Sequence, residues 1–235
     1  MSHIFALPER PSAAIAGTDA TFPVRRIFCI GRNYAAHARE MGKDPDREAP
    51  FFFTKWADAL VPNGATIAYP PQTANYQYEA ELVIAIGKEG AAVAEADALD
   101  LVFGYAAGLD MTRRDLQFEA RDKGRPWDAG KNFAFSAPMA AIRPVLGGGH
   151  LSTAPIQLRV NGDLKQDGDI ADLIWDCAET IAYLSKFERL LPGDLIFTGT
   201  PAGVGAVVVG DVIDVTIEGL EPLRVTIGAS EVDFA

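Results

Sequence analysis

The stretch YQYEAELVIAIG, residues 76–87, has the two-residue period of a β-strand and carries two acids in its first half. Tyr78 and Leu82 share one face of this strand, whereas Glu79 and Glu81 begin the opposite face, which then becomes apolar. Side chains two residues apart on a strand lie about 7 Å apart and point the same way. Two carboxylates in that arrangement repel each other unless water, a basic side chain or a metal ion lies between them. The stretch therefore predicts a strand whose acidic face is either solvated or a cation site.

The composition is that of an ordinary globular chain with excess negative charge. Its 235 residues are 49% hydrophobic, which is enough to fill a sizeable core. The formal net charge is -11 and the isoelectric point is about 4.7. Nucleic acids and anionic membranes are bound through basic surfaces, so we expect small molecules or a second copy of the chain as partners instead.

The cysteines and the N-terminal residues give no indication of export or membrane insertion. Cys29 and Cys177 lie far apart and lack the spacing of a zinc site or a disulfide framework. The N-terminal stretch lacks the basic segment of a signal peptide, and no run of about 18 apolar residues occurs in the sequence. We therefore expect a cytoplasmic protein with reduced thiols.

Strand patterns outnumber helix patterns along the rest of the chain. Strands are predicted over residues 24–31, 51–55 and 101–110, and a hairpin over 156–168 with its turn at Asn161-Gly162, a dipeptide that favours two-residue hairpin turns. Helices are predicted over residues 33–42, 93–100, 112–122 and 170–187, the last being the longest, with Asn33 as N-cap and Gly42 as C-terminal stop of the first.

The order of these elements indicates the fold class. Strands and helices do not alternate regularly, which favours an α+β, β-rich fold, a mixed β-roll or sandwich with a few short helices, over a doubly wound sheet. We expect a single domain over residues 21–235, preceded by a loosely structured N-terminal arm over residues 1–20.

Asp110 is a candidate third ligand for a cation held by the two strand glutamates. It ends the apolar strand directly before a predicted helix, where functional groups often lie. Its alternative role is helix N-cap, but Thr112 with Asp115 three residues later imitates a capping box, which leaves Asp110 free. Three carboxylates offer hard oxygen ligands, which suit Mg²⁺, Mn²⁺ or Ca²⁺ rather than Zn²⁺.

His37 and Glu40 form a second candidate pair, because residues three apart share one face of a helix. A carboxylate beside an imidazole fixes its tautomer and raises its basicity, as a general base requires. A solvated surface pair is the alternative interpretation. The glycine-rich stretch TGTPAGVG, residues 198–205, lacks the lysine of a phosphate-binding loop and precedes a strand. It predicts a tight turn whose amides, with Thr198 or Thr200, would hold a carboxylate or an oxyanion.

Seven stretches of the chain together resemble the fumarylacetoacetate hydrolase family. They follow the family's order over about residues 24–218 and read CIGRNYAAHAREMG, PFFFTKWADALVPNG, YEAELVIAIG, GYAAGLDMTRRDLQ, GRPWDAGKNFAFSAP, RVNGDLKQ and LLPGDLIFTGTPAGVG. The resemblance implies a mixed β-roll that forms a homodimer and binds Mg²⁺ or Mn²⁺ as its cofactor. It also implies site residues at the matching positions, namely the metal ligands Glu79, Glu81 and Asp110, the catalytic dyad His37 and Glu40, a lysine at Lys131, and substrate contacts at Gln117 and Thr200.

The same resemblance implies hydrolysis of the C–C bond of a 2,4-dioxo acid. Within the family the chain is most similar to members that cleave acylpyruvates in the gentisate route of aromatic degradation, so the expected reaction converts fumarylpyruvate and water to fumarate and pyruvate. His37, polarised by Glu40, would deprotonate the attacking water, while Lys131 and Gln117 would donate hydrogen bonds to the developing negative charge. The distal carboxylate of fumarylpyruvate needs a cation, for which Arg32, Arg113, Arg121 and Arg125 are all candidates that the sequence does not separate. Arg32 is expected among the substrate-binding residues.

Two alternatives stay open at this point. One keeps the metal site but changes the reaction to decarboxylation of oxaloacetate, or to a decarboxylase/isomerase activity, which other members of the family carry out. The other is a non-catalytic, β-rich protein whose acids bind Ca²⁺ structurally.

Overall fold

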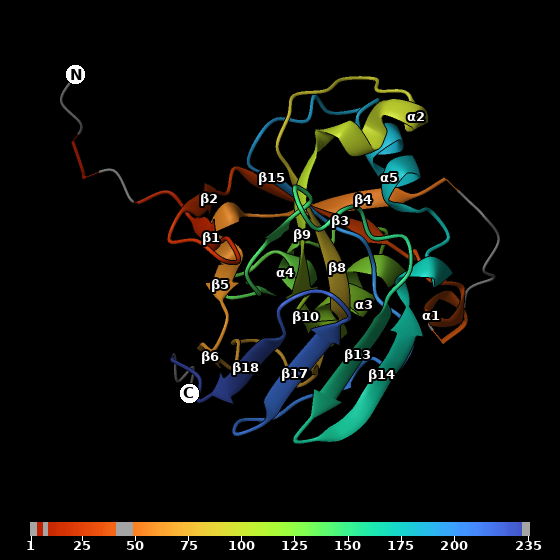
Figure 1. Ribbon diagram of the computed structural model, residues 1–235. Helices are drawn as coiled ribbons and strands as arrows, with labels where there is room; N and C mark the ends of the chain where they lie inside the picture. The colour runs from red at the N-terminus through yellow and green to blue at the C-terminus, as the bar shows by residue number, and fades with distance from the viewer. Residues whose placement is uncertain (1–3, 7–8, 41–48, 232–235) are drawn as a thin grey trace.

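Strand β8 (Ala80–Ile86) runs through the middle of the structure, and all of its residues are buried. The computed structural model describes residues 4–6, 9–40 and 49–231, and places this strand in the largest sheet (Figure 1). The strands of that sheet follow the order β4 (Phe51–Lys55), β3 (Arg26–Gly31), β15 (Asp194–Phe197), β8, β9 (Val102–Leu109), β11 (Ala137–Met139) and β5 (Leu60–Pro62), and β12 (Arg143–Pro144) also pairs with β9. Strand β8 is antiparallel to both neighbours, whereas β15 and β3 are parallel, so the sheet is mixed.

A five-stranded sheet packs against one face of the large sheet. Its order is β14 (Asp163–Asp169), β13 (Pro155–Val160), β17 (Val212–Ile217), β18 (Leu223–Gly228) and β6 (Thr66–Ala68). Ile84 of β8, Ile156 of β13 and Val215 of β17 are fully buried in the same apolar core. Because apolar side chains of both sheets meet there, the two sheets are held together by burial of their inner faces.

The other face of the large sheet is covered by the N-terminal hairpin. Strand β1 (Ser12–Ala14) pairs with β2 (Thr21–Pro23), and Phe22 packs in a second apolar cluster with Val83 and Ala85 of β8. Part of the arm predicted over residues 1–20 is therefore a regular strand. This hairpin explains why the face of β8 that begins with acids continues as an apolar surface.

The remaining elements are short. A small sheet has the order β10 (Thr112–Arg113), β7 (Tyr76–Tyr78) and β16 (Gly205–Ala206). The helices are α1 (Ala35–Glu40), α2 (Glu95–Ala98), α3 (Arg114–Asp122), α4 (Asp128–Lys131) and α5 (Cys177–Leu184), with 3₁₀ helices η1 (Ala57–Ala59), η2 (Leu99–Leu101) and η3 (Ile170–Asp172). Helices α2 and α5 lie together at one end of the large sheet (Figure 1). In the described part of the chain, no helix is long and apolar enough to cross a membrane.

The structure confirms the β-rich α+β class and several of the predicted elements. Strand β4 has the predicted bounds 51–55, and the predicted hairpin turns at Asn161 and Gly162 with φ angles of +52° and +89°. Both residues lie in the left-handed region, as a type I′ turn requires.

The prediction of a long helix over residues 170–187 is wrong. A 3₁₀ turn comes first, and helix α5 begins only at Cys177, where Asp176 and Glu179 form a reciprocal capping box. The intervening residues are held by Asn33, whose side-chain oxygen accepts a hydrogen bond from Trp175 N at 2.7 Å. The longest helix of the described residues is α3, with nine residues.

Asn33 itself does not have its predicted place as N-cap of the first helix, because that helix begins at Ala35. Its side-chain amide donates to the carbonyl oxygens of Trp175 and Thr198, at 2.9 and 2.8 Å. A buried side chain that satisfies backbone groups of two distant loops joins those loops to β3. The predicted helix stop, Gly42, lies outside the described residues.

Candidate metal centre

The three predicted ligands meet where two antiparallel strands end. The double-acid strand is interrupted at Glu79, because β7 belongs to the small sheet and β8 to the large one. Ala80 pairs with Leu109 across the ladder, and Asp110 N donates to Glu79 O at 2.9 Å. The carboxylates of Glu79, Glu81 and Asp110 are buried, with ligand atoms within 4.8 Å of one another. That spacing is close to the roughly 4.2 Å between opposite oxygens around an octahedral Mg²⁺ or Mn²⁺ ion.

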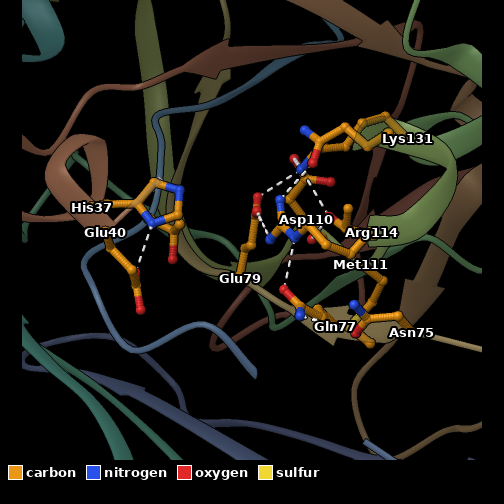
Figure 2. A network of polar contacts seen from close by, with 12 residues as sticks. His37, Glu40, Asn75, Gln77, Glu79, Asp110, Met111, Arg114 and Lys131 are labelled. Atoms are coloured by element: carbon orange, nitrogen blue, oxygen red, sulfur yellow. Dashed lines mark hydrogen bonds and ion pairs between the residues drawn. The ribbon is translucent and has the colours of Figure 1, made fainter. Parts of the chain in front are cut away.

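Basic side chains surround Glu79 and Asp110. Lys131 Nζ lies 2.6 Å from Glu79 Oε2 and 2.8 Å from Asp110 Oδ2. Arg114 Nη2 lies 2.5 Å from Glu79 Oε1, and Lys55 Nζ lies 2.9 Å from Asp110 Oδ1. Figure 2 shows Glu79 between Lys131 and Arg114 on one side and the imidazole of His37 on the other. These cations bind the first and third acids directly, and Glu81 is left with a backbone partner, since Gly199 N donates to its Oε2 at 2.8 Å.

This arrangement gives the two glutamates opposite pKa shifts. Burial alone would raise the pKa of Glu79, but Lys131 and Arg114 hold it well below its ordinary value. Burial raises the pKa of Glu81 well above its ordinary value, and the negative charges of Asp110 and Glu79 raise it further. A cation beside Glu81 would stabilise the charged form of this carboxylate.

The residues fit a divalent metal ion. Asp110 Oδ1 accepts no hydrogen bond from the described residues, because Lys55 directs its hydrogen bonds to the carbonyl oxygens of Met111, at 3.2 Å, and Lys131. Asp110 Oδ1 has the Lys55 ammonium 2.9 Å away but accepts no hydrogen bond in the described part of the chain, and Glu81 beside it has no cation. A hard divalent cation would satisfy both carboxylates. Glu79, Glu81 and Asp110 thus form a divalent metal site.

Two cations of this centre, Lys55 and Arg114, were not predicted from the sequence. Lys55 shares one face of β4 with Phe51 and Phe53, and a lysine on an aromatic strand face is a pattern that indicates a buried ion pair. Arg114 was absent from the arginine candidates, although it is 2% exposed and donates to Gln77, Gln117 and Glu79. Only the fold shows that Arg114, and not the adjacent Arg113, reaches the metal centre.

The capping box predicted at Thr112 and Asp115 is wrong. Thr112 lies in β10, and its hydroxyl donates to Asp110 O at 3.0 Å and accepts from Lys131 Nζ at 2.8 Å. Asp115 accepts hydrogen bonds from Thr73 Oγ1, Ala74 N and Leu116 N instead. Thr112 is therefore part of the support of the metal centre. Asp110 does not cap α3, whose N-cap position is Arg113, so the predicted capping box is not the reason.

The predicted dyad forms at the edge of the same pocket. His37 Nδ1 lies 3.1 Å from Glu40 Oε2, and Gly203 N donates to both oxygens of Glu40 at 3.2 Å. The His37 residue is 7% exposed and lines the pocket, whereas Glu40 is exposed, so only the imidazole of the pair is buried. The pocket lined by His37 is also lined by Glu79 and Thr200.

The other predicted substrate contacts line this pocket as well. Gln117 Oε1 accepts from Arg114 Nη1 at 2.6 Å, and Thr200 Oγ1 accepts from Gln166 Nε2 at 2.8 Å. Of the predicted arginines, Arg32 and Arg121 line the pocket, whereas Arg113 and Arg125 are not among the described lining residues. Arg113 stacks over the ring of Phe133, 4.3 Å from its centroid. The loop 198–200 holds Glu81 because Gly199 adopts a φ of +102°, a conformation that glycine allows without strain.

A mixed β-roll whose pocket is lined by three buried carboxylates and by His37, which is paired with Glu40, defines a divalent-metal protein. The family model described as fumarylacetoacetate (FAA) hydrolase C-terminal matches residues 26–228, and the chain belongs to this family.

The chain covers nearly the whole length of three similar proteins. A fumarylpyruvate hydrolase from a Ralstonia species is 52% identical over 193 residues, which cover 81% of this chain and 100% of that protein. A crystal structure of fumarylpyruvate hydrolase from Pseudomonas aeruginosa in complex with Mn²⁺ and pyruvate is 54% identical, with a TM-score of 0.95, and covers 97% of this chain and 100% of that one. The mitochondrial oxaloacetate tautomerase of Rattus norvegicus is 41% identical over 207 residues, 88% of this chain and 93% of that protein.

Proposed function

We propose that this protein hydrolyses the C–C bond of a 2,4-dioxo acid, and that its substrate is fumarylpyruvate, cleaved to fumarate and pyruvate. The observation that carries the proposal is the position of the His37–Glu40 dyad at the pocket of the carboxylate centre. The relatives named fumarylpyruvate hydrolase, at 52% and 54% identity, support the choice of substrate.

Glu79, Glu81 and Asp110 would hold the cofactor, for which we propose Mg²⁺ or Mn²⁺ because all three ligands are hard oxygens. When bound, such an ion supplies positive charge to the 2-oxo acid end of the substrate, where negative charge develops as the C–C bond breaks. The crystallised relative with Mn²⁺ and pyruvate supports this orientation of the substrate.

His37 is the general base in this proposal. Its Nδ1 is occupied by Glu40, which leaves Nε2 to take a proton from water. The water oxygen then attacks the C4 carbonyl carbon, and the bond between C3 and C4 breaks. The new carboxyl group is that of fumarate and releases the second proton of the water to solvent, while the first proton passes from His37 to C3 of the departing pyruvate. Water is thus the only co-reactant, and atoms and charge balance.

Gln117 is a better hydrogen-bond donor to the developing negative charge than Lys131. The three hydrogen bonds of Lys131 Nζ go to Glu79, Asp110 and Thr112, so this ammonium is occupied in holding two of the metal ligands. The amide oxygen of Gln117 is fixed by Arg114, which leaves its N–H groups for the substrate. Thr200 similarly accepts from Gln166 and keeps its own proton to donate to a substrate oxygen. We place Arg32 at the distal carboxylate.

The experiment follows the loss of the conjugated-diketone absorbance of fumarylpyruvate, with Mg²⁺, with Mn²⁺ and with EDTA. We expect metal-dependent cleavage and a loss of kcat of about 10²- to 10⁴-fold in His37→Asn, the usual contribution of a general base. His150→Asn is the matched control, because His150 bonds Tyr105 at 3.0 Å and does not line the pocket. Full turnover by His37→Asn would overturn the role of the dyad.

Oxaloacetate serves as the competing substrate, since a relative at 41% identity is named an oxaloacetate tautomerase. Faster consumption of oxaloacetate than of fumarylpyruvate would favour that alternative reaction at the same metal site. A protein that binds Ca²⁺ and turns over neither compound would be the non-catalytic alternative.

We also propose that the protein is a cytoplasmic homodimer, on the family resemblance. Light scattering coupled to size-exclusion chromatography tests the dimer, because one chain has a mass of 25.2 kDa.

A further inference from the structure

A second hollow opens next to the metal pocket and has aromatic walls. It encloses about 570 Å³ and shares Arg32, Phe53, Trp127 and Lys131 with the pocket of the carboxylate centre. Phe51 and Phe53 lie on the same face of β4, and the ring of Trp127 stands edge-on to Phe51 at a centroid distance of 5.2 Å. We call the space bounded by Phe51, Phe53, Trp127 and Arg32 the acyl compartment. A ligand bound at the metal centre would extend directly into it.

The chain places Arg32 at the junction of the two spaces at some conformational cost. Arg32 has a φ of +59°, a left-handed conformation that costs energy for any residue except glycine. The preceding Gly31 packs against the Phe51 ring so closely that an added Cβ would lie 2.1 Å from it. The Arg32 guanidinium then lies 5.3 Å from the centroid of that ring. Strain and close packing of this kind are retained where geometry serves a ligand.

Arg32 also differs from the other arginines of the site in its partners. It makes no hydrogen bond or ion pair with any residue in the described ranges, and its one recorded contact is the Phe51 ring. Arg114, in contrast, is fully used by Glu79, Gln77 and Gln117. Arg121 is paired with Asp122 at 2.9 Å and stacked on Phe118. A half-buried guanidinium without an anionic partner is the group best placed to receive one from a ligand.

We propose that the acyl compartment selects 2,4-dioxo acids whose acyl group is planar and ends in a carboxylate. The proposal rests on the proposed function and adds which acyl groups the site prefers. Aromatic walls pack well against a flat conjugated chain, and the guanidinium fork of Arg32 pairs with the terminal carboxylate. The chain as a whole carries a formal charge of -11, so a dianionic substrate needs such a local cation.

The first test compares wild type and Arg32→Gln on fumarylpyruvate and on acetylpyruvate, which has no distal carboxylate. We expect kcat/KM for fumarylpyruvate to fall about 10- to 150-fold, the range for losing hydrogen bonds between charged groups. The value for acetylpyruvate should fall by a clearly smaller factor, because this substrate has no distal carboxylate to lose its partner. Arg125→Gln is the matched control, because Arg125 is exposed and is not among the described residues of either pocket. Equal losses on both substrates would overturn the proposal.

A second test uses Trp127→Leu with succinylpyruvate, which has the same charge as fumarylpyruvate but a flexible, saturated acyl chain. The preference for fumarylpyruvate over succinylpyruvate should shrink in this variant, because a flat chain loses its aromatic wall. An unchanged preference would remove the aromatic part of the proposal and leave only the role of Arg32.

A third test needs only the wild-type protein and therefore does not depend on the folding of a variant. Fumarate should inhibit acetylpyruvate cleavage about tenfold more strongly than crotonate, its planar analogue with one carboxylate. Equal inhibition would contradict the assignment of Arg32. If the wild type cleaves no 2,4-dioxo acid at all, the proposed function fails; if it cleaves them without preference for the anionic acyl group, only the acyl compartment fails.

Discussion

Replacing Gln166 by leucine should destabilise the protein strongly, because one buried amide joins three separate segments. Gln166 lies on β14 and is 0% exposed. Its nitrogen donates to Thr200 Oγ1 at 2.8 Å and to Pro201 O at 2.7 Å, and its oxygen accepts from Ala80 N at 2.9 Å. Ala80 stands between the two glutamates of the metal centre, so this amide connects the five-stranded sheet, the start of β8 and the loop that holds Glu81.

The expected magnitude follows from the groups left without partners. Leucine has a similar volume, so the cavity term is small, but the Ala80 N–H and the Pro201 carbonyl would stay buried and unsatisfied. Each such group costs about 1–3 kcal/mol, and the Thr200 hydroxyl loses a further bond of about 1 kcal/mol. The free energy of unfolding should therefore fall by about 3–7 kcal/mol, a large part of the 5–15 kcal/mol typical of a domain.

Urea unfolding at pH 7 measures this difference. Gln157→Leu on the neighbouring strand β13 is the matched control, since its amide bonds only the Asp167 side chain at 2.9 Å in an exposed position, and it should cost less than about 0.5 kcal/mol. Gln166→Leu should also raise KM for fumarylpyruvate, because Thr200 loses the donor that orients its hydroxyl. A loss of stability below about 1 kcal/mol in Gln166→Leu would refute the reasoning.

Three further predictions concern charge and metal. Lys55→Met should weaken Mn²⁺ affinity about 10- to 100-fold in a calorimetric titration, because Asp110 loses the ammonium 2.9 Å from its Oδ1 and with it the support of its orientation; unchanged affinity would contradict this role. Mn²⁺ at 100 times its Kd should stabilise the fold by about 2.7 kcal/mol and raise Tm by about 5–10 °C, whereas Glu81→Gln should show a smaller rise. Asp115→Ala should be less stable than wild type at pH 7, and the difference should disappear in acid. Partial burial raises the pKa of Asp115, but hydrogen bonds from Thr73, Ala74 and Leu116 lower it below 3.8. The stabilisation is therefore present above that pH and is lost as the pH falls through the folded-state pKa. A pH-independent difference would contradict this source of stability.

Much of the local structure could be predicted from consecutive residues. The buried strand over 80–86, the strand over 51–55 and the Asn161-Gly162 turn all formed as expected, because side-chain alternation and left-handed turn preferences act over a few neighbouring residues. The long helix over 170–187 failed for a tertiary reason: Asn33, more than 130 positions earlier in the chain, takes the backbone groups of Trp175. No local pattern contains that contact.

The sequence by itself determined which side chains are candidates for the chemistry. The spacing of Glu79 and Glu81, the position of Asp110 after an apolar strand, and the interval between His37 and Glu40 are properties of the chain before it folds, and the family motifs added their expected roles. Only the tertiary structure decided how those charges are balanced. Lys55 and Lys131 reach Asp110 through pairing and packing between segments far apart in the sequence, and Gly199 reaches Glu81 across β8 and β15. The physical reason is that a buried carboxylate is stabilised by whatever lies within a few ångströms of it in space, whereas periodicity along the chain reports only which face a residue occupies.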